Sequence, residues 1–202
     1  MNQIITKVES PFPYLKIQNM YSDEELDLIH QELVFLNHEH KLKGPEETGS
    51  AVENSIILKR NKGLFLDDIY YRREISNILS INRKTFSKEY LELYASLTFG
   101  YGSILTCNCD TTLISYYENE AYYQSHTDDA VHTALTWFFK VPKVFEGGNL
   151  IFTEYDEVVE IEHNMTIIFP SFVKHSVEEV VMEENLPRGF GRYSMSQFLF
   201  VR

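Results

Sequence analysis

Two histidines and two aspartates stand immediately before a strongly apolar segment of the chain. They occur in "YYQSHTDDAVHTALTWFF", residues 122–139. Side chains in an extended segment alternate between two faces, so His126 and Asp128 are expected to project from the same face. Asp129 is interpreted as a turn residue beside them. An imidazole and a carboxylate that meet at one point can begin a metal site, but this pair alone is too common to indicate one.

A histidine that can complete such a site lies in "FPSFVKHSVEEV", where His175 begins a β-rich segment. Two histidines and one carboxylate on one face of a metal ion leave adjacent positions open, which is typical of non-haem Fe(II) oxygenases. Zinc favours four tetrahedral ligands, and magnesium favours more oxygen ligands. The set His126, Asp128 and His175 therefore favours iron.

The other histidines fit this role less well. His132 follows the first pair so closely that the chain would have to fold straight back, and His163 in "EIEHNMT" is interpreted as a turn residue between strands. His38 and His40 follow a predicted helix, where residues two apart diverge by about 200°. We interpret both as part of a solvated helix end.

The last predicted strand carries a different chemical signal. In "GRYSMSQFLF", residues 191–200, alternation places Arg192, Ser194 and Ser196 on one face. If that face points inward, the arginine is a buried charge, which is unfavourable unless an anion neutralises it. A planar guanidinium can hold a carboxylate through two parallel hydrogen bonds. The sequence therefore predicts a carboxylate receptor on this strand.

The order of these segments resembles the Fe(II)- and 2-oxoglutarate-dependent dioxygenases, specifically their prolyl-4-hydroxylase-like branch. The resemblance covers roughly residues 104–202, and "PYLKIQNMYSDEELDLIHQEL" resembles the N-terminal strand and helix of that branch. The matching segments are "SYYENEAYYQSHTD", "TALTWFFKVPKVFEGGNLIF", "NMTIIFPSFVKHSVEEV" and "GRYSMSQFLF".

The resemblance implies a double-stranded β-helix in which the two histidines and Asp128 bind Fe(II). It implies that Arg192 binds the distal carboxylate of 2-oxoglutarate, that Ser194 assists, and that Tyr116 hydrogen-bonds this cosubstrate. The reaction implied consumes O2, releases succinate and CO2 and hydroxylates an aliphatic C–H, with ascorbate as a possible reductant. Gly147 and Gly148 match a tight turn of the family, where residues without a β-carbon allow a sharp bend.

The chain departs from the family pattern before its last strand. The family usually places its basic residue about ten positions after the second histidine, whereas Arg192 lies 17 positions after His175. We interpret residues 182–191, "MEENLPRGFG", as an elongated hairpin loop that preserves the register. Arg188, within that loop, is the weaker alternative.

Helices are predicted in the first half of the chain and strands in the second. Ser22 and Glu25 have capping-box spacing, and apolar residues recur at helical intervals up to Leu36. Two more helices are predicted in 65–80 and 84–100, and the polar segment 41–54 is interpreted as a loop or lid. From about residue 103 onward, short β-rich segments are separated by turns.

These elements predict an α+β fold, a β-sandwich or barrel with N-terminal helices that buttress one sheet face, and the resemblance implies that this core is a double-stranded β-helix (jelly-roll). At 202 residues, the chain is expected to form a single domain over 1–202, with a supporting region in 1–100 and a catalytic core in 101–202. Cys107 and Cys109 are interpreted as small buried groups and not as a disulfide.

Composition limits the partners. The 18 basic and 30 acidic residues give a net charge of −12, which repels nucleic-acid phosphates and anionic membranes. We see no secretory signal or membrane span, so a cytoplasmic location is expected. Oligomeric state is left open.

The first substrate hypothesis is a protein or peptide residue, with proline favoured by the resemblance, and the second is a free amino acid or related metabolite. A nucleic-acid demethylase is third, disfavoured by the charge. A non-catalytic binding module on the same fold is the alternative of another class.

Overall fold

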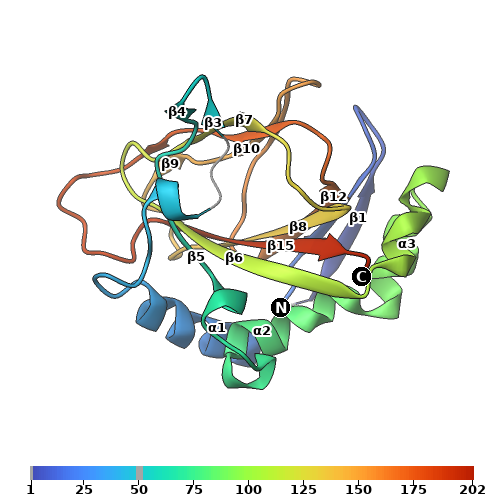
Figure 1. Cartoon of the computed structure of the whole chain (residues 1–202), viewed down its shortest axis with the longest axis horizontal. Coiled ribbons are helices and arrows are strands. Elements are labelled where there is room, and N and C mark those ends of the chain that lie inside the picture. Colours follow the sequence, from blue (N-terminus) through green and yellow to red (C-terminus); the bar gives the residue numbers. More distant parts are fainter. Residues whose placement is uncertain (1, 49–51) are drawn as a thin grey trace.

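The computed structural model describes residues 2–48 and 52–202, which form two facing antiparallel sheets with helices beneath the larger one (Figure 1). The helices are α1 (Asp23–Leu36), α2 (Asn77–Ile81) and α3 (Lys88–Ala95). In Figure 1, α1 and α2 lie below the larger sheet, and α3 lies at its β1 end. The predicted α+β double-stranded β-helix is confirmed.

The larger sheet contains strands from both halves of the chain. The N-terminal strands β1 and β2 extend one edge, and β5 extends the other, so the supporting region is part of the core sheet. In spatial order the strands are β1 (Ile4–Val8), β2 (Tyr14–Gln18), β12 (Met165–Pro170), β8 (His132–Phe138), β15 (Arg192–Phe200), β6 (Cys109–Tyr117) and β5 (Lys62–Phe65).

The smaller sheet lies across the interior from the larger one. Its strands, in spatial order, are β11 (Glu157–Val159), β10 (Leu150–Phe152), β13 (His175–Val177) and β7 (Tyr123–His126). Two short pairs complete the β structure: β14 (Val180–Val181) with β9 (Glu146–Gly147), and β3 (Val52–Glu53) with β4 (Ile56–Ile57). Short 3-10 helices occupy Pro45–Glu47, Leu66–Asp68, Arg73–Ile75, Asn82–Phe86 and Phe99–Thr106.

Alternation along the strands builds a separate core on each face of the larger sheet. Ile114 and Tyr116 of β6 pack with the helices. Trp137 and Phe169, on β8 and β12, pack between the sheets with Phe152 of β10. The space between the sheets is therefore lined by one face of each strand, and this is where inward-pointing polar groups can meet.

Helix α1 begins as its sequence predicts. The Ser22 side chain accepts from the Glu25 backbone N–H, and the Glu25 carboxylate accepts from the Ser22 backbone N–H, so the capping box is complete. This reciprocal pair satisfies two backbone donors that the first helical turn cannot satisfy itself. The other end finishes at Asn37, and His38 and His40 beyond it are exposed, as expected for a solvated helix end.

The prediction of one helix over 65–80 is wrong, because the segment forms two 3-10 turns before the short α2. The Asp67 carboxylate accepts from the Thr112 backbone N–H at 2.6 Å and pairs with Arg73 at 3.4 Å. These bonds attach the segment to β6, and tertiary contacts of this kind override local helix propensity. The start of the segment at 103–117 also differs, since residues 99–106 are 3-10 helix before β6 begins.

The predicted lid over 41–54 includes residues 49–51, which lie outside the described residues. Before them, Lys43 forms a backbone bridge with Gly63 of β5, and Thr48 lies at the interior. The predicted elongated loop over 182–191 joins β14 to β15. Within the described residues, no helix is both long and apolar enough to cross a membrane.

Candidate metal and cosubstrate site

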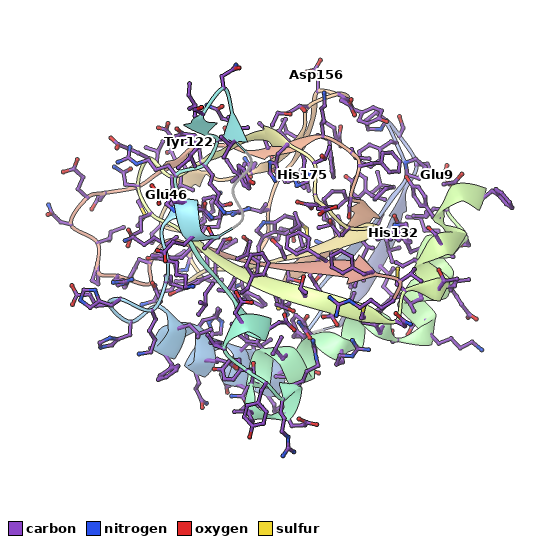
Figure 2. All side chains as sticks on the ribbon, in the orientation of Figure 1. Glu9, Glu46, Tyr122, His132, Asp156 and His175 are labelled. Atoms are coloured by element: carbon purple, nitrogen blue, oxygen red, sulfur yellow. The ribbon has the colours of Figure 1, made fainter. Side chains whose placement is uncertain are left out.

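The predicted metal ligands meet at the edge of the smaller sheet. His126 ends β7 and His175 begins β13, and the two residues are direct partners in the antiparallel pairing. Asp128 lies in the turn after β7. Its carboxylate oxygens are 3.7 Å from His126 Nε2 and 3.6 Å from His175 Nε2. One ligand atom from each residue lies within 4.8 Å of the others, and Figure 2 shows His175 between the two sheets.

Backbone and hydroxyl groups fix how these ligands are presented. His126 Nδ1 donates to the Gln124 carbonyl at 2.8 Å, and His175 Nδ1 donates to the Val173 carbonyl at 2.9 Å. A carbonyl only accepts, so in each neutral ring the proton is on Nδ1 and the lone pair of Nε2 faces the centre of the site. Hydrogen bonds of this type orient metal-binding histidines in proteins.

The third ligand is held by a hydroxyl pair on the larger sheet. Thr133 Oγ1 donates to Asp128 Oδ2 at 2.7 Å and lies 2.8 Å from Ser171 Oγ. The Asp128 backbone N–H donates to the Ser171 carbonyl at 3.0 Å. Because β8 and the β12–β13 turn supply these partners, the carboxylate position depends on the packing of both sheets.

The site keeps His126 in the neutral form that a metal requires. Its ring stacks on Tyr123 with centroids 3.6 Å apart, and burial removes the water that would stabilise an imidazolium. Burial lowers the pKa of His126 to about 3, with a further lowering by His175. No proton therefore competes with a metal ion for Nε2 near neutral pH.

The two rival histidines have other partners. His132 is buried, with Nδ1 3.0 Å from the Tyr94 hydroxyl and Nε2 2.7 Å from Ser103 Oγ. Its partner Tyr94 belongs to α3, on the helix-covered side of the larger sheet, whereas His175 belongs to the smaller sheet. His163 Nδ1 accepts from the Phe139 backbone N–H at 3.2 Å. Both nitrogens of His132 therefore have protein partners, and the structure places His175 with His126 and Asp128.

The metal-binding residues open onto a cavity of about 420 Å³ between the sheets. This volume lies in the usual range for small-molecule sites. One face of β15 and one face of β6 form its floor, and apolar residues of β8, β10 and β13 form part of its walls. Lining residues from these strands include Arg192, Ser194, Ser196, Leu113, Ser115, Tyr117, Leu135, Leu150 and Val177.

Arg192 is a buried cation without a counter-ion among the described residues. The residue is 1% exposed, and its Nε and Nη1 atoms have no hydrogen-bond partner there. Its guanidinium lies 4.5 Å from the Tyr117 ring centroid. Burial lowers the pKa of Arg192 to about 10, so the group stays charged at neutral pH. Unpaired N–H groups on a buried cation are unfavourable and indicate a place for an anion.

The turn at Gly147–Gly148 makes room for this arginine. Both glycines have positive φ, +64° and +70°, which side chains with a β-carbon rarely adopt. A β-carbon on Gly148 would lie 3.0 Å from Arg192 Cδ. The alternative basic residue, Arg188, donates from Nε to the Asn37 side chain and is not among the residues that line the cavity.

The predicted role of Tyr116 is not supported by its position. Tyr116 points to the helix-covered face of β6, and its hydroxyl accepts from the Gly189 and Gly191 backbone N–H groups at 2.7 and 3.2 Å. Its neighbour Tyr117 faces the cavity and pairs with Arg192 across β6 and β15. Adjacent strand residues face opposite sides, so Tyr117 lines the cavity and Tyr116 does not.

The cavity also contains a charged residue that the sequence did not single out. Lys59 is only 4% exposed and lines the cavity near β7. It stands in a polar, basic stretch, "LKRNKG", where nothing distinguishes a buried lysine from a solvated one. Trp137, in contrast, is fully buried and packs 6.0 Å from Arg192 without lining the cavity.

The residues present fit an iron ion and a dicarboxylic cosubstrate. Two imidazoles and one carboxylate at a single point form the ligand set typical of non-haem Fe(II) enzymes. In the same cavity, the unpartnered Nε and Nη1 atoms of the buried Arg192 guanidinium indicate a place for an anion, and guanidinium groups commonly bind carboxylates. Ser194 lies on the same face of β15 as Arg192, as predicted.

Solved structures share this fold. A prolyl-4-hydroxylase from Pseudomonas putida aligns over 94% of this chain and 92% of its own, with a TM-score of 0.59 and 16% identity. A viral collagen prolyl hydroxylase from Paramecium bursaria Chlorella virus-1 aligns over 93% and 96%, with a TM-score of 0.56 and 14% identity. The alpha-ketoglutarate-dependent epimerase SnoN from nogalamycin biosynthesis aligns over 93% and 78%, with a TM-score of 0.53 and 10% identity.

No protein-family model matches this chain, and no curated protein matches its sequence. The structural likeness at these identities establishes the fold, which is that of prolyl-4-hydroxylases and other 2-oxoglutarate–Fe(II) oxygenases.

Proposed function

We propose that this protein is an Fe(II)- and 2-oxoglutarate-dependent dioxygenase that hydroxylates an aliphatic C–H bond. The observation that carries the proposal is the combination, in one cavity, of a His–Asp–His set and a fully buried arginine with two unpaired N–H groups. A metal site alone fits several chemistries. A second, separate receptor for a carboxylate fits a metal enzyme with a dicarboxylic cosubstrate.

Each residue has a defined task in this proposal. His126, Asp128 and His175 hold the iron, and Arg192 binds the distal carboxylate of 2-oxoglutarate with Ser194 beside it. The chemistry that the bound iron, 2-oxoglutarate and O2 supply is decarboxylation to succinate and CO2 coupled to conversion of C–H to C–OH. Apolar walls such as Leu135 exclude water from the reacting groups.

The substrate proposed first is a prolyl residue of a protein or peptide. Two solved structures with this fold are prolyl hydroxylases, and this is the branch that the sequence segments resemble. A small-molecule substrate is the second candidate, because the cavity is lined by a buried lysine that can recognise a single charged group. The net charge of −12 disfavours a third candidate, a nucleic-acid substrate.

The proposal is tested first without a substrate. The purified protein is loaded anaerobically with Fe(II), and 2-oxoglutarate is then added. A weak visible charge-transfer band is expected, because the 2-oxo acid chelates the iron. A folded protein that binds neither Fe(II) nor Mn(II), and shows no band, would instead support a non-catalytic binding module on this fold.

The substrate is addressed next by measuring succinate formation. A proline-containing peptide library and a set of free amino acids are compared for stimulation of 2-oxoglutarate turnover. Peptide-specific stimulation supports the first candidate, and stimulation by free amino acids alone supports the second. If no peptide in the library increases succinate formation, the prolyl hypothesis is excluded.

A further inference from the structure

Lys59 is attached to the strand that carries a metal ligand. Residues 58–60 run beside β7, where Lys59 and Tyr123 form a backbone bridge. The Gln124 N–H donates to the Leu58 carbonyl at 2.8 Å, and the Arg60 N–H donates to the Tyr122 carbonyl at 2.9 Å. This pairing fixes the backbone of Lys59 beside β7 and holds its side chain at the cavity wall.

The Lys59 ammonium is buried, and its Nζ donates to the Thr48 carbonyl at 2.9 Å. Among the side chains that the structure describes, which exclude those of residues 49–51 and Glu53, no carboxylate forms an ion pair with it. An ammonium has three donors, and lysines are rarely fully buried unless they are paired. Burial lowers the pKa of Lys59 to about 8, so most molecules still carry the charge at pH 7. A buried charge without a counter-ion is unfavourable.

Lys59 lies beside β7 of the smaller sheet, whereas the strand that carries Arg192 belongs to the larger sheet. Its Nζ is 5.3 Å from the Tyr123 ring centroid, and that ring stacks directly on His126. Arg192 stands on β15 of the opposite sheet. Lys59 and Arg192 are the basic residues that line the cavity in the described part of the chain, and they approach it from different sheets.

We propose that Lys59 is the receptor for a carboxylate group of the primary substrate, an inference that rests on the proposed dioxygenase function. Arg192 is then occupied by the cosubstrate, and Lys59 provides a second anion site one aromatic ring away from His126. Pairing with Lys59 orients the substrate so that its aliphatic part, and not its charged end, faces the metal ligands. Binding also neutralises the buried ammonium, which favours acids over neutral analogues.

A carboxylate of this kind has two sources. It can be the α-carboxylate of a free amino acid or related small acid, or it can belong to a peptide as a C-terminus or an acidic side chain. The shared chemistry is one carboxylate held by Lys59, and the probes below separate the sources.

The test measures binding to the iron- and 2-oxoglutarate-loaded protein in the absence of oxygen. Three matched probe sets are titrated while the charge-transfer band is followed: free amino acids, N-acetyl amino acids and N-acetyl amino acid amides. The first two sets carry the carboxylate and the third does not. Short peptides with free or amidated C-termini form the peptide arm.

Two substitutions distinguish recognition from packing. In Lys59→Met, a neutral side chain of similar length, carboxylate probes are expected to bind at least 30-fold more weakly. In Lys59→Arg, which restores the charge, they should bind within about 5-fold of wild type. The dissociation constant of 2-oxoglutarate should change less than 2-fold in both variants. A purely structural role for Lys59 predicts equal losses for acids and amides.

Several results would overturn this inference while leaving the proposed function intact. One is a normal band in wild type that no carboxylate probe perturbs, and another is amide binding equal to acid binding in wild type and Lys59→Met. A third is a loss of 2-oxoglutarate affinity in Lys59→Met as large as that in Arg192→Met, which would assign Lys59 to the cosubstrate. Absence of the band in wild type would instead remove the proposed function and this inference together.

Discussion

Two buried charged residues stand at opposite ends of the β6–β15 strand pair, and their surroundings differ. At one end, Asp110 is 2.7 Å from Arg83 and 3.0 Å from Arg73, and it accepts from Gln197 at 2.9 Å. At the other end, Arg192 has two N–H groups without partners in the described chain. The first charge is neutralised by the protein, and the second requires something from outside it.

The histidines differ in the same way. His132 uses both ring nitrogens on Tyr94 and Ser103, whereas His126 and His175 use Nδ1 on backbone carbonyls and turn Nε2 toward Asp128. A buried polar group with complete partners supports packing, and one with an unused atom aimed into a cavity indicates a ligand. Six variants test this distinction.

The largest effect is expected for His175→Ala. Losing one of three ligands should weaken Fe(II) or Mn(II) binding by more than 100-fold, because only two protein ligands would then remain to hold the ion. Anaerobic metal titration measures this directly. The matched control is His132→Gln, which should retain metal affinity within about 3-fold. Equal losses in the two variants would contradict the assignment.

Arg192→Met should separate cosubstrate binding from stability. We expect 2-oxoglutarate affinity to fall by at least 100-fold, since a desolvated charge pair is typically worth several kcal/mol when one partner is removed. The free energy of unfolding without cosubstrate should stay the same or rise by about 1 kcal/mol, because a buried unpaired charge disappears. Denaturant titrations with and without 2-oxoglutarate measure both quantities, and a large loss of stability would place Arg192 among the structural charges.

Asp110→Asn should show the opposite pattern. Two arginines lose their shared counter-ion, and we expect the free energy of unfolding to fall by about 2 kcal/mol or more. Both arginines are partly exposed, so solvent limits the loss. Affinity for 2-oxoglutarate should remain near wild type. A selective loss of cosubstrate binding in this variant would contradict the assignment of Asp110 as a structural charge.

Tyr116→Phe and Tyr117→Phe test the one-residue correction of register. The first leaves the Gly189 and Gly191 N–H groups without their acceptor and should lower the free energy of unfolding by about 1–3 kcal/mol. It should not alter 2-oxoglutarate affinity. Tyr117→Phe, which removes the hydroxyl of the ring beside Arg192, should alter that affinity more than stability. Reversal of the two outcomes would restore Tyr116 as the cosubstrate residue.

The smallest effect concerns pH. Burial lowers the pKa of His132 to about 4, below the ordinary value of 6.5. The contribution of the neutral His132 to the free energy of unfolding is fully present above pH 6.5 and decreases toward pH 4. Between these pH values the histidine binds a proton in the unfolded chain but stays neutral in the folded chain. His132→Gln should therefore lose less stability than wild type between pH 7 and pH 5. Urea titrations at both pH values provide the comparison.

Sequence patterns predicted the parts of the site that depend on residue type and strand periodicity. Imidazole, carboxylate and guanidinium side chains indicate by their type which ligands they can bind. Period-two alternation placed Arg192 and Ser194 on one face of the strand. The capping box at Ser22 could also be predicted from the sequence, because its two hydrogen bonds join residues three apart. The double-stranded β-helix followed from the resemblance carried by the last hundred residues.

Features that depend on contacts between distant parts of the chain could not be predicted from the sequence. Alternation alone cannot choose between Tyr116 and Tyr117, because each of two adjacent tyrosines suits either face of a strand. Residues 65–80 lost their predicted helix to bonds between Asp67 and β6. Lys59 became a cavity residue only because its segment pairs with β7, and that pairing joins parts of the chain more than sixty residues apart.

The direct pairing of His126 with His175 has a consequence for folding. Strand β7 is four residues long and meets β13 through an irregular register, so few backbone bonds hold this edge of the smaller sheet. An ion shared by both histidines ties the strands together, and its binding energy adds to the stability of that edge. If the site binds a metal ion as proposed, we expect amide hydrogens of β7 and β13 to exchange more slowly in the metal-loaded protein than in the metal-free one.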